Sequence, residues 1–379
     1  MKKTRITLLI LLTLAARAPL AAQSAPAFER DEQGHVRVKL GHGAKVAVDN
    51  TTTGRIVVEG WDRDYVEAVA TSGRGTEYVR ARSAVGPEGQ VVALTADYGS
   101  SPLPSLPTLS GPFAEQPGQK PTPAPTPAPT PSPRPAPAEA TPLWRFFRGS
   151  EEVHLNVKLP RHAELELIEV VRSEVEVSGM LTPVTVSGRR SAVKLRDVGA
   201  VEVRTERGPV EVDGASGLVD VITTDGHVHI RNVKGDVRAV SLSGRVEVRC
   251  VRGRVNVSNT QGAIVLAGVD GDVDATTVNS DVTFDGPLRG EGRYHLKSMS
   301  GAVEMGVRRN PPGFTALLSS YRGAVESDFK LGPRQPPKGP AGTRLLGRHG
   351  DGRAQITLDS FDGHVKLSRL TQDSAEGCR

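Results

Sequence analysis

The chain has 379 residues, of which 37% are hydrophobic, 24% are charged and only 4% are aromatic. Its formal net charge is +5, from 48 Lys and Arg against 43 Asp and Glu, and four of the basic residues lie within the first 22 positions. Without that segment 44 basic residues face 43 acidic ones. No large basic field is left, which excludes nucleic acid from the expected partners.

Residues 1–22 have the pattern of a secretory signal peptide. Three basic residues within the first five positions precede an apolar run at 6–16, and small residues follow near position 22. This order is typical of a cleaved export signal. The run is too short for a permanent membrane helix, and no later stretch reaches about 18 uncharged apolar residues. We therefore expect an exported protein, periplasmic or at the cell surface, without a transmembrane segment after signal cleavage.

Residues 30–100 predict N-terminal strands and a first, divergent repeat unit, because Gly54, Ile56 and Val58 follow a pattern that later units repeat. The next segment, 101–142, holds 15 of the 28 prolines. Such a tract favours a disordered, extended polyproline II conformation and cannot pair in a sheet. Strand-like sequence on both sides favours an insertion within one domain over a linker between two.

An 18-residue period organises residues 143–330. Gly208, Gly226, Gly244 and Gly262 are each 18 positions apart, and Ser280 takes the next place. Apolar and polar residues alternate after each of them, which is the period of strands. The expected inward pairs of the first strand are Val210/Val212, Val228/Ile230, Val246/Val248, Ile264/Leu266 and Val282/Phe284. Those of the second strand are Val201/Val203, Val219/Val221, Val237/Ala239, Val255/Val257 and Val273/Ala275, followed by small polar residues at Thr205, Thr223, Ser241, Asn259 and Thr277.

This period predicts an all-β fold: a parallel β-helix or β-solenoid with rungs of about 18 residues, capped by N-terminal and C-terminal strands. One unit cannot bury its valine stripe alone, but stacked units pair their backbones at about 4.8 Å and bury the stripes together. The first Gly of each unit fits a tight corner with positive φ. Beyond the solenoid we expect a Pro/Gly-rich loop at 331–353, closing strands at 354–370 and a disordered tail at 371–379.

Two cysteines, Cys250 and Cys378, are too few for a disulfide framework, although an oxidising compartment permits one bridge. A bridge between them and a free or intermolecular thiol at Cys378 both remain open. Neither cysteine lies in a lipid-anchor motif after the signal.

Four passages occur together and in a fixed order: "GRIVVEGWDRDYVEAVA", "VHLNVKLPRHAELEL", serial T-x-G-x-V-x-V units and a closing "ITLDSFDGHVKL". With these passages the chain resembles the bacterial β-strand-repeat proteins of the adhesin-like type, a family of undefined function. The resemblance covers residues 30–370 apart from the proline-rich insertion. It implies an exported parallel β-solenoid of the cell envelope, and it carries over no catalytic residues.

The outward positions of the first strands alternate in sign and favour a solvated salt-bridge ladder over a reaction site. They are Glu176, Lys194, Glu211, His229, Glu247, Val265, Thr283 and Glu304. The densest acidic patch consists of Asp270, Asp272, Asp274, Asp281 and Asp285. Turns favour Asp, and the sequence lacks the glycine-rich calcium repeat, so we interpret the patch as structural.

His227 and His229 are two zinc-competent side chains, fewer than the three or four protein ligands that zinc takes. The aromatic passage at 143–149 is interpreted as an anchor of the insertion. We therefore predict no catalytic, cofactor or metal site.

The expected function is that of a non-enzymatic envelope scaffold that binds an envelope protein or a surface glycan through strand faces or the proline-rich arm. Two alternatives stay open. One is a carbohydrate-active β-helix enzyme, a lyase or hydrolase, and the other is an accessory protein of an envelope stress-sensing system.

Overall fold

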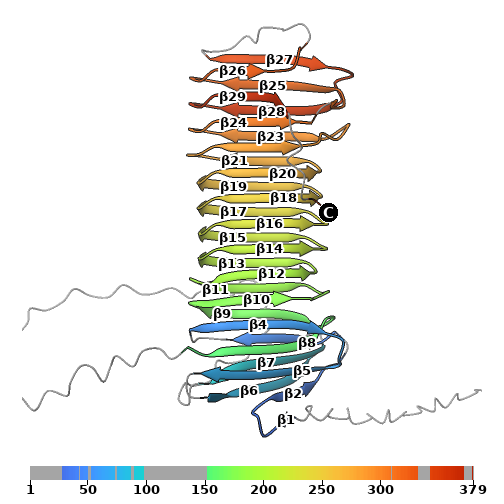
Figure 1. Ribbon diagram of the computed structural model, residues 1–379, viewed down its shortest axis with the longest axis vertical. Coiled ribbons are helices and arrows are strands. Elements are labelled where there is room, and N and C mark those ends of the chain that lie inside the picture. The colour runs from blue at the N-terminus through green and yellow to red at the C-terminus, as the bar shows by residue number, and fades with distance from the viewer. Residues whose placement is uncertain are drawn as a thin grey trace, which may run out of the picture.

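The structure is a computed structural model, and it describes residues 28–41, 43–49, 53–72, 75–86, 89–97, 152–308, 310–331, 342–370 and 378. Within these residues the chain forms 29 strands that join in one stack. Figure 1 shows the strands lying across the long axis of a tall column, rung upon rung. The expectations for residues 1–22, 101–142, 143–149 and 371–377 lie outside the described part.

Seven strands precede the repeats: β1 (Glu29–Arg30), β2 (Val36–Lys39), β3 (Lys45–Asp49), β4 (Gly54–Trp61), β5 (Tyr65–Ser72), β6 (Gly75–Gly86) and β7 (Gly89–Asp97). Sheet A continues with β8 (His154–Pro160), β10 (Ser173–Ser178), β12 (Ala192–Val198), β14 (Val210–Ala215), β16 (Val228–Val233), β18 (Val246–Arg252), β20 (Ile264–Asp270), β22 (Val282–Gly286), β24 (Val303–Val307), β26 (Val325–Ser327) and β29 (Val365–Arg369). Sheet B continues with β9 (Glu164–Val171), β11 (Val184–Arg189), β13 (Val201–Arg207), β15 (Val219–Asp225), β17 (Val237–Ser243), β19 (Val255–Gln261), β21 (Val273–Thr277), β23 (Arg293–Ser298), β25 (Phe314–Ser320), β27 (Thr343–His349) and β28 (Ala354–Ser360).

Each rung contributes one strand to each sheet, and equivalent strands of successive rungs pair in parallel and in register. In sheet A, Val210 lies opposite Val228, which lies opposite Val246. Alternating side chains therefore form columns, and every predicted inward pair is buried. Each such side chain contributes roughly 1.5–3 kcal/mol by leaving water. The prediction of an all-β solenoid is confirmed.

The predicted ladder of small polar residues is also buried, and its side chains, except that of Thr223, bond to corner backbone. Thr205 Oγ1 donates to the carbonyl oxygen of Arg207 at 3.1 Å, and Asn259 Nδ2 donates to that of Gly244 at 2.7 Å. The ladder continues through Ser298, Ser360 and Ser320 in the later rungs. These bonds satisfy carbonyl groups that leave the sheets at each corner.

The corners place backbone against backbone, which explains the glycine that opens each unit. A Cβ on Gly226 would lie 2.1 Å from the carbonyl oxygen of Gly208, and φ at Gly226 is +156°. A second glycine column, in addition to the predicted one, lies at the opposite corners: Gly217, Gly235, Gly253 and Gly271. There a Cβ on Gly253 would lie 2.2 Å from the carbonyl oxygen of Gly235.

A third buried apolar column lies in sheet A. Each of its members comes three positions, instead of two, after the second residue of an inward pair. Its members are Val198, Ala215, Val233, Val251 and Val269. The residue before each has a left-handed backbone: Asp197, Gly214, Asn232, Cys250 and Gly268, with φ between +50° and +82°. This extra residue acts as a bulge that resets the alternation. Strict two-residue periodicity therefore misses the column.

Strand order in space departs from chain order at both ends of the stack. In sheet A, β8 lies between β4 and β5. The expected closing strands at 354–370 are β28 and β29, but they insert between earlier strands: β28 pairs with β23 and β25, and β29 pairs with β24 and β26.

The expectation of a loop throughout 331–353 needs correction, because Thr343–His349 form β27, antiparallel to β25. In this strand only Leu345 and Gly347 are buried. Its apolar pattern in the sequence is therefore short, and polar and proline-rich residues surround it. The strand covers the edge of β25, which would otherwise be left unpaired.

Val246→Asp tests the inward parity. Val246 is 0% exposed, so the variant buries a charge without a partner and should lower the free energy of unfolding by about 4 kcal/mol. Glu247→Lys changes the adjacent, outward side chain and should cost about 1 kcal/mol or less. Urea unfolding of both variants measures the difference, and equal losses would contradict the assigned parity.

Candidate functional site

The corners that lead from sheet B into sheet A form one long edge of the column, which we call the B–A edge. Each corner begins just after the small polar residue near the end of a sheet B strand, as at 206–209 and 224–227. Because the strands stack in register, equivalent corner residues form columns along the edge. Two stretches of this edge differ from the mixed charges of the sheets: an arginine column near its N-terminal end and an apolar ridge near its C-terminal end.

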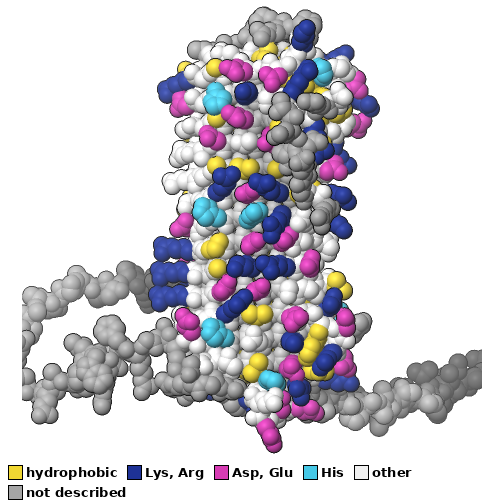
Figure 2. All heavy atoms as spheres, viewed as in Figure 1, with side chains coloured by type: hydrophobic (Ala, Val, Ile, Leu, Met, Phe, Trp, Pro, Cys, Tyr) yellow, Lys and Arg dark blue, Asp and Glu magenta, His cyan; other side chains and the backbone are white. Residues whose placement is uncertain are grey.

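The arginine column consists of Arg172, Arg190 and Arg207, at equivalent positions on three consecutive rungs. All three side chains are exposed, and none forms an ion pair with a carboxylate among the described residues. Figure 2 shows a vertical run of Lys and Arg side chains at the left edge, at the level of β10 to β13 in Figure 1. The next residue of the column, Asp225, accepts a hydrogen bond from Ser243 Oγ at 3.0 Å.

Two physical costs attach to this column. Unit charges one rung apart, at about 4.8 Å, repel by about 0.9 kcal/mol even in water. Arg172 and Arg190 also have φ of +50° and +54°, a left-handed conformation that costs a non-glycine residue roughly 1–2 kcal/mol. Among the described residues no carboxylate offsets either cost.

A groove of about 320 Å³ lies beside the column on the outer face of sheet B. Its lining includes Ile168, Ser187, Arg204 and Ile222, from four consecutive strands of the sheet. The pairing of β9 with β11 shifts register between Val186 and Gly188, at the same place. The groove therefore runs along the column axis, parallel to the arginines.

Two carboxylates, Glu169 and Glu206, line the groove, and others lie near it. Arg189 Nε lies 3.6 Å from Glu206 Oε1, and Arg204 pairs with Glu202. Burial, together with the neighbouring Glu169 carboxylate, raises the pKa of Asp49 above its ordinary range.

The apolar ridge consists of Met299, Phe361 and Tyr321, at equivalent corners of β23, β28 and β25. These side chains are 55%, 44% and 47% exposed. The rings of Tyr321 and Phe361 stack with centroids 4.7 Å apart and planes 9° apart, and the Arg322 guanidinium lies 5.4 Å from the Phe361 centroid. The sequence carries a signal for the ridge: "SMSGAV", "SYRGAV" and "SFDGHV" place an apolar residue two positions before the corner glycine.

The family model described as Toastrack DUF4097 matches residues 138–368, more than half of the chain. The chain belongs to the Toastrack DUF4097 family. Among solved structures, it is similar to a "putative cell adhesion protein" from Clostridium sporogenes, with 8% identity, a TM-score of 0.21, and coverage of 89% of this chain and 99% of that chain. No curated protein matches the chain.

In this Toastrack chain the predicted outward residues of sheet A form ion pairs between and along rungs. Glu176 pairs with Arg55 and also with Arg196 at 3.7 Å. Farther along, Arg231 pairs with Glu211 at 3.3 Å, and His364 pairs with Glu304 at 2.8 Å. The geometry is that of a salt-bridge ladder.

The acidic patch is divided among structural roles. Asp272 and Asp281 accept backbone N–H bonds from Arg293 and Ala302, at 3.1 and 2.8 Å. Asp270 pairs with Arg289 at 3.4 Å, and Asp274 pairs with His295 at 3.3 Å. Of the two histidines considered, His227 accepts the N–H of Arg245 through Nδ1 at 3.2 Å. Within the described ranges no three His, Cys, Asp or Glu side chains are grouped to hold a metal ion.

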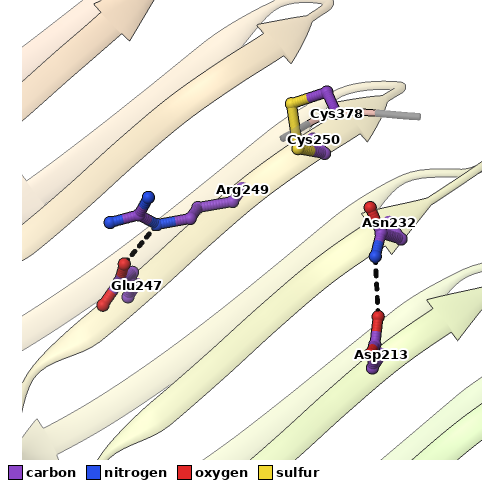
Figure 3. The surroundings of a disulfide bond; sticks show 6 residues. All are labelled: Asp213, Asn232, Glu247, Arg249, Cys250 and Cys378. Atoms are coloured by element: carbon purple, nitrogen blue, oxygen red, sulfur yellow. Dashed lines mark hydrogen bonds and ion pairs between the residues drawn. A yellow bond between two sulfur atoms is a disulfide. The ribbon is translucent and has the colours of Figure 1, made fainter. Parts of the chain in front are cut away.

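A disulfide joins Cys250 to Cys378, with Cα atoms 5.1 Å apart, and so decides between the two possibilities left open above. Figure 3 shows the bond on β18, where Cys250 has the left-handed backbone of its column. At the equivalent place one rung earlier, Asn232 Nδ2 donates to Asp213 Oδ1 at 2.7 Å. The bridge fixes a residue near the C-terminus to the middle of the solenoid.

Asp285 gives a pH-dependent test of the patch. Burial, with a smaller effect of Glu304, raises its pKa. The favourable contribution of Asp285 to the free energy of unfolding is therefore present below the ordinary Asp pKa of about 3.9. It is lost as pH rises through the raised pKa. Asp285→Asn should raise Tm by about 1–2 °C at pH 7 and by nothing near pH 3.

The control for this measurement is Asp274→Asn, which changes an exposed, ion-paired carboxylate and should not stabilise the protein at pH 7. An equal rise in Tm from Asp285→Asn at both pH values would contradict burial of the Asp285 carboxylate as the cause.

Proposed function

We propose that this Toastrack protein is an exported, non-enzymatic scaffold of the bacterial cell envelope, adhesin-like in type, that holds a partner along its B–A edge. The observation that carries the proposal is the apolar ridge of Met299, Phe361 and Tyr321, which is exposed on a rigid corner. A role for the proline-rich segment 101–142 stays part of the proposal, although that segment lies outside the described residues.

Export is supported by the disulfide and by the signal pattern of residues 1–22. Disulfides form and persist in secreted and periplasmic proteins and are rare in a reducing cytosol. The Cys250–Cys378 bond joins residues 128 positions apart. A mature protein that keeps this bond fits an oxidising compartment. Among the described residues no helix is long and apolar enough to cross a membrane.

A scaffold role is supported by how the side chains are used. Four of the five carboxylates of the acidic patch cap corners or form ion pairs, and the five do not converge on one point where a substrate would react. Exposed aromatic residues are enriched where proteins bind partners. The rings of Tyr321 and Phe361 stack on each other and stay 47% and 44% exposed, so their exposed surface is available to a partner.

The test is saturable binding of the purified protein to isolated envelopes of the producing bacterium. Tyr321→Ser/Phe361→Ser should weaken this binding at least tenfold with little effect on Tm. The control, Leu181→Ser/Leu218→Ser, removes two leucines that are 70% and 52% exposed on the opposite corners, and it should leave binding unchanged.

Equal losses in both double variants would contradict a site on the B–A edge. The non-enzymatic assignment is checked separately by incubating the wild-type protein with neutral and uronate-rich polysaccharides. New reducing ends or unsaturated products would contradict it.

A further inference from the structure

We propose that the arginine column and the groove beside it bind a linear, carboxylate-bearing polysaccharide, that is, a polyuronate. The inference rests on the proposed scaffold function and specifies the chemistry of one partner. It uses a surface separate from the apolar ridge.

The charges of the site point to an external anion. Several arginines on other rungs of the solenoid have carboxylate partners; Arg231, for example, lies 3.3 Å from Glu211 and 2.9 Å from Asp213. Arg172, Arg190 and Arg207 have none among the described residues. A guanidinium presents paired N–H donors that match a carboxylate. Three of them in a line match a chain that carries a carboxylate on each monomer.

The backbone conformation of the arginine column also indicates an external anion. Arg172 and Arg190 occupy left-handed positions that Gly or Asn adopts at lower cost. Neither side chain gains an ion pair within the described part of the fold that would offset this cost. Strain of this kind is often retained at binding sites. A bound anion supplies the compensating interaction.

The shape of the site selects among polyanions. The groove runs parallel to the arginine column, and Ile168 and Ile222 line it with apolar surface. The apolar faces of sugar rings can rest there while their carboxylates reach the arginines. A flat lipid bilayer meets only the rim of such a groove. Successive rungs lie about 4.8 Å apart, a step comparable to one monomer of an extended polysaccharide.

The carboxylates near the groove do not cancel this attraction. Glu206 is paired with Arg189 and Glu202 with Arg204, which leaves Glu169 and the half-buried Asp49 against three arginines. Both of these acids lie at the N-terminal end of the site. The positive side of the groove, toward Arg207, is therefore free to receive a ligand.

The experiment measures the affinity of the full mature protein for polygalacturonate by titration calorimetry in 50 mM salt. The site variant is Arg172→Gln/Arg190→Gln/Arg207→Gln. The matched control is Arg252→Gln/Arg254→Gln/Arg293→Gln, which removes the same charge from exposed arginines at or beside the opposite corners. We expect the site variant to weaken Kd at least tenfold and the control to stay within twofold of the wild type.

Equal weakening in both variants would overturn the site and leave only general electrostatic attraction. Binding of anionic phosphatidylglycerol vesicles or of duplex DNA as tightly as polygalacturonate, lost in the same site variant, would overturn the assignment to a polyuronate. A wild-type protein that binds envelopes through its apolar ridge but does not bind polygalacturonate would overturn this inference alone. Polygalacturonate binding by a wild-type protein that does not bind envelopes, or whose envelope binding is unchanged in Tyr321→Ser/Phe361→Ser, would count only against the proposed function.

Discussion

The whole structure depends on the contact of each rung's backbone with that of the next. Strands pair in register from β10 to β24, and at the corners one glycine lies directly on another, so that no Cβ fits between them. This contact fixes the repeat at one strand spacing and holds the register of the stacked glycine rungs. The buried valine columns, the polar ladder and the outward rows of charge all follow from it.

A fixed register turns surface chemistry into lines. Where neighbouring rungs carry opposite charges, as at Glu211 and Arg231, the line is a salt-bridge ladder and is neutral overall. Where neighbouring rungs carry like side chains, their charge or apolar surface accumulates along the long axis of the stack. The arginine column and the apolar ridge are two such lines on the same edge, and both face solvent. A protein built this way is suited to extended partners that match its repeat.

The period of the sequence was sufficient to predict the fold class, the inward pairs and the polar ladder, because a two-residue alternation repeated every 18 residues has one stacked solution. The column through Val233 and Val251 could not be predicted, since the left-handed residue before each one breaks the alternation. The insertion of β28 between β23 and β25 depends on long-range pairing that no local pattern encodes. Of the candidate site, Phe361 and Tyr321 had a readable signal, whereas the alignment of Arg172 with Arg190 and Arg207 required the register.

The most direct test of this account is to place a methyl group between two rungs. A Cβ at position 253 would lie 2.2 Å from the carbonyl oxygen of Gly235, whereas a Cβ at Gly290 would meet nothing within 4 Å. Thermal unfolding should therefore show Gly253→Ala losing about 5 °C or more in Tm, consistent with about 2 kcal/mol of strain, and Gly290→Ala unchanged. Equal Tm values for the two variants would contradict the claim that backbone contact between rungs governs the fold.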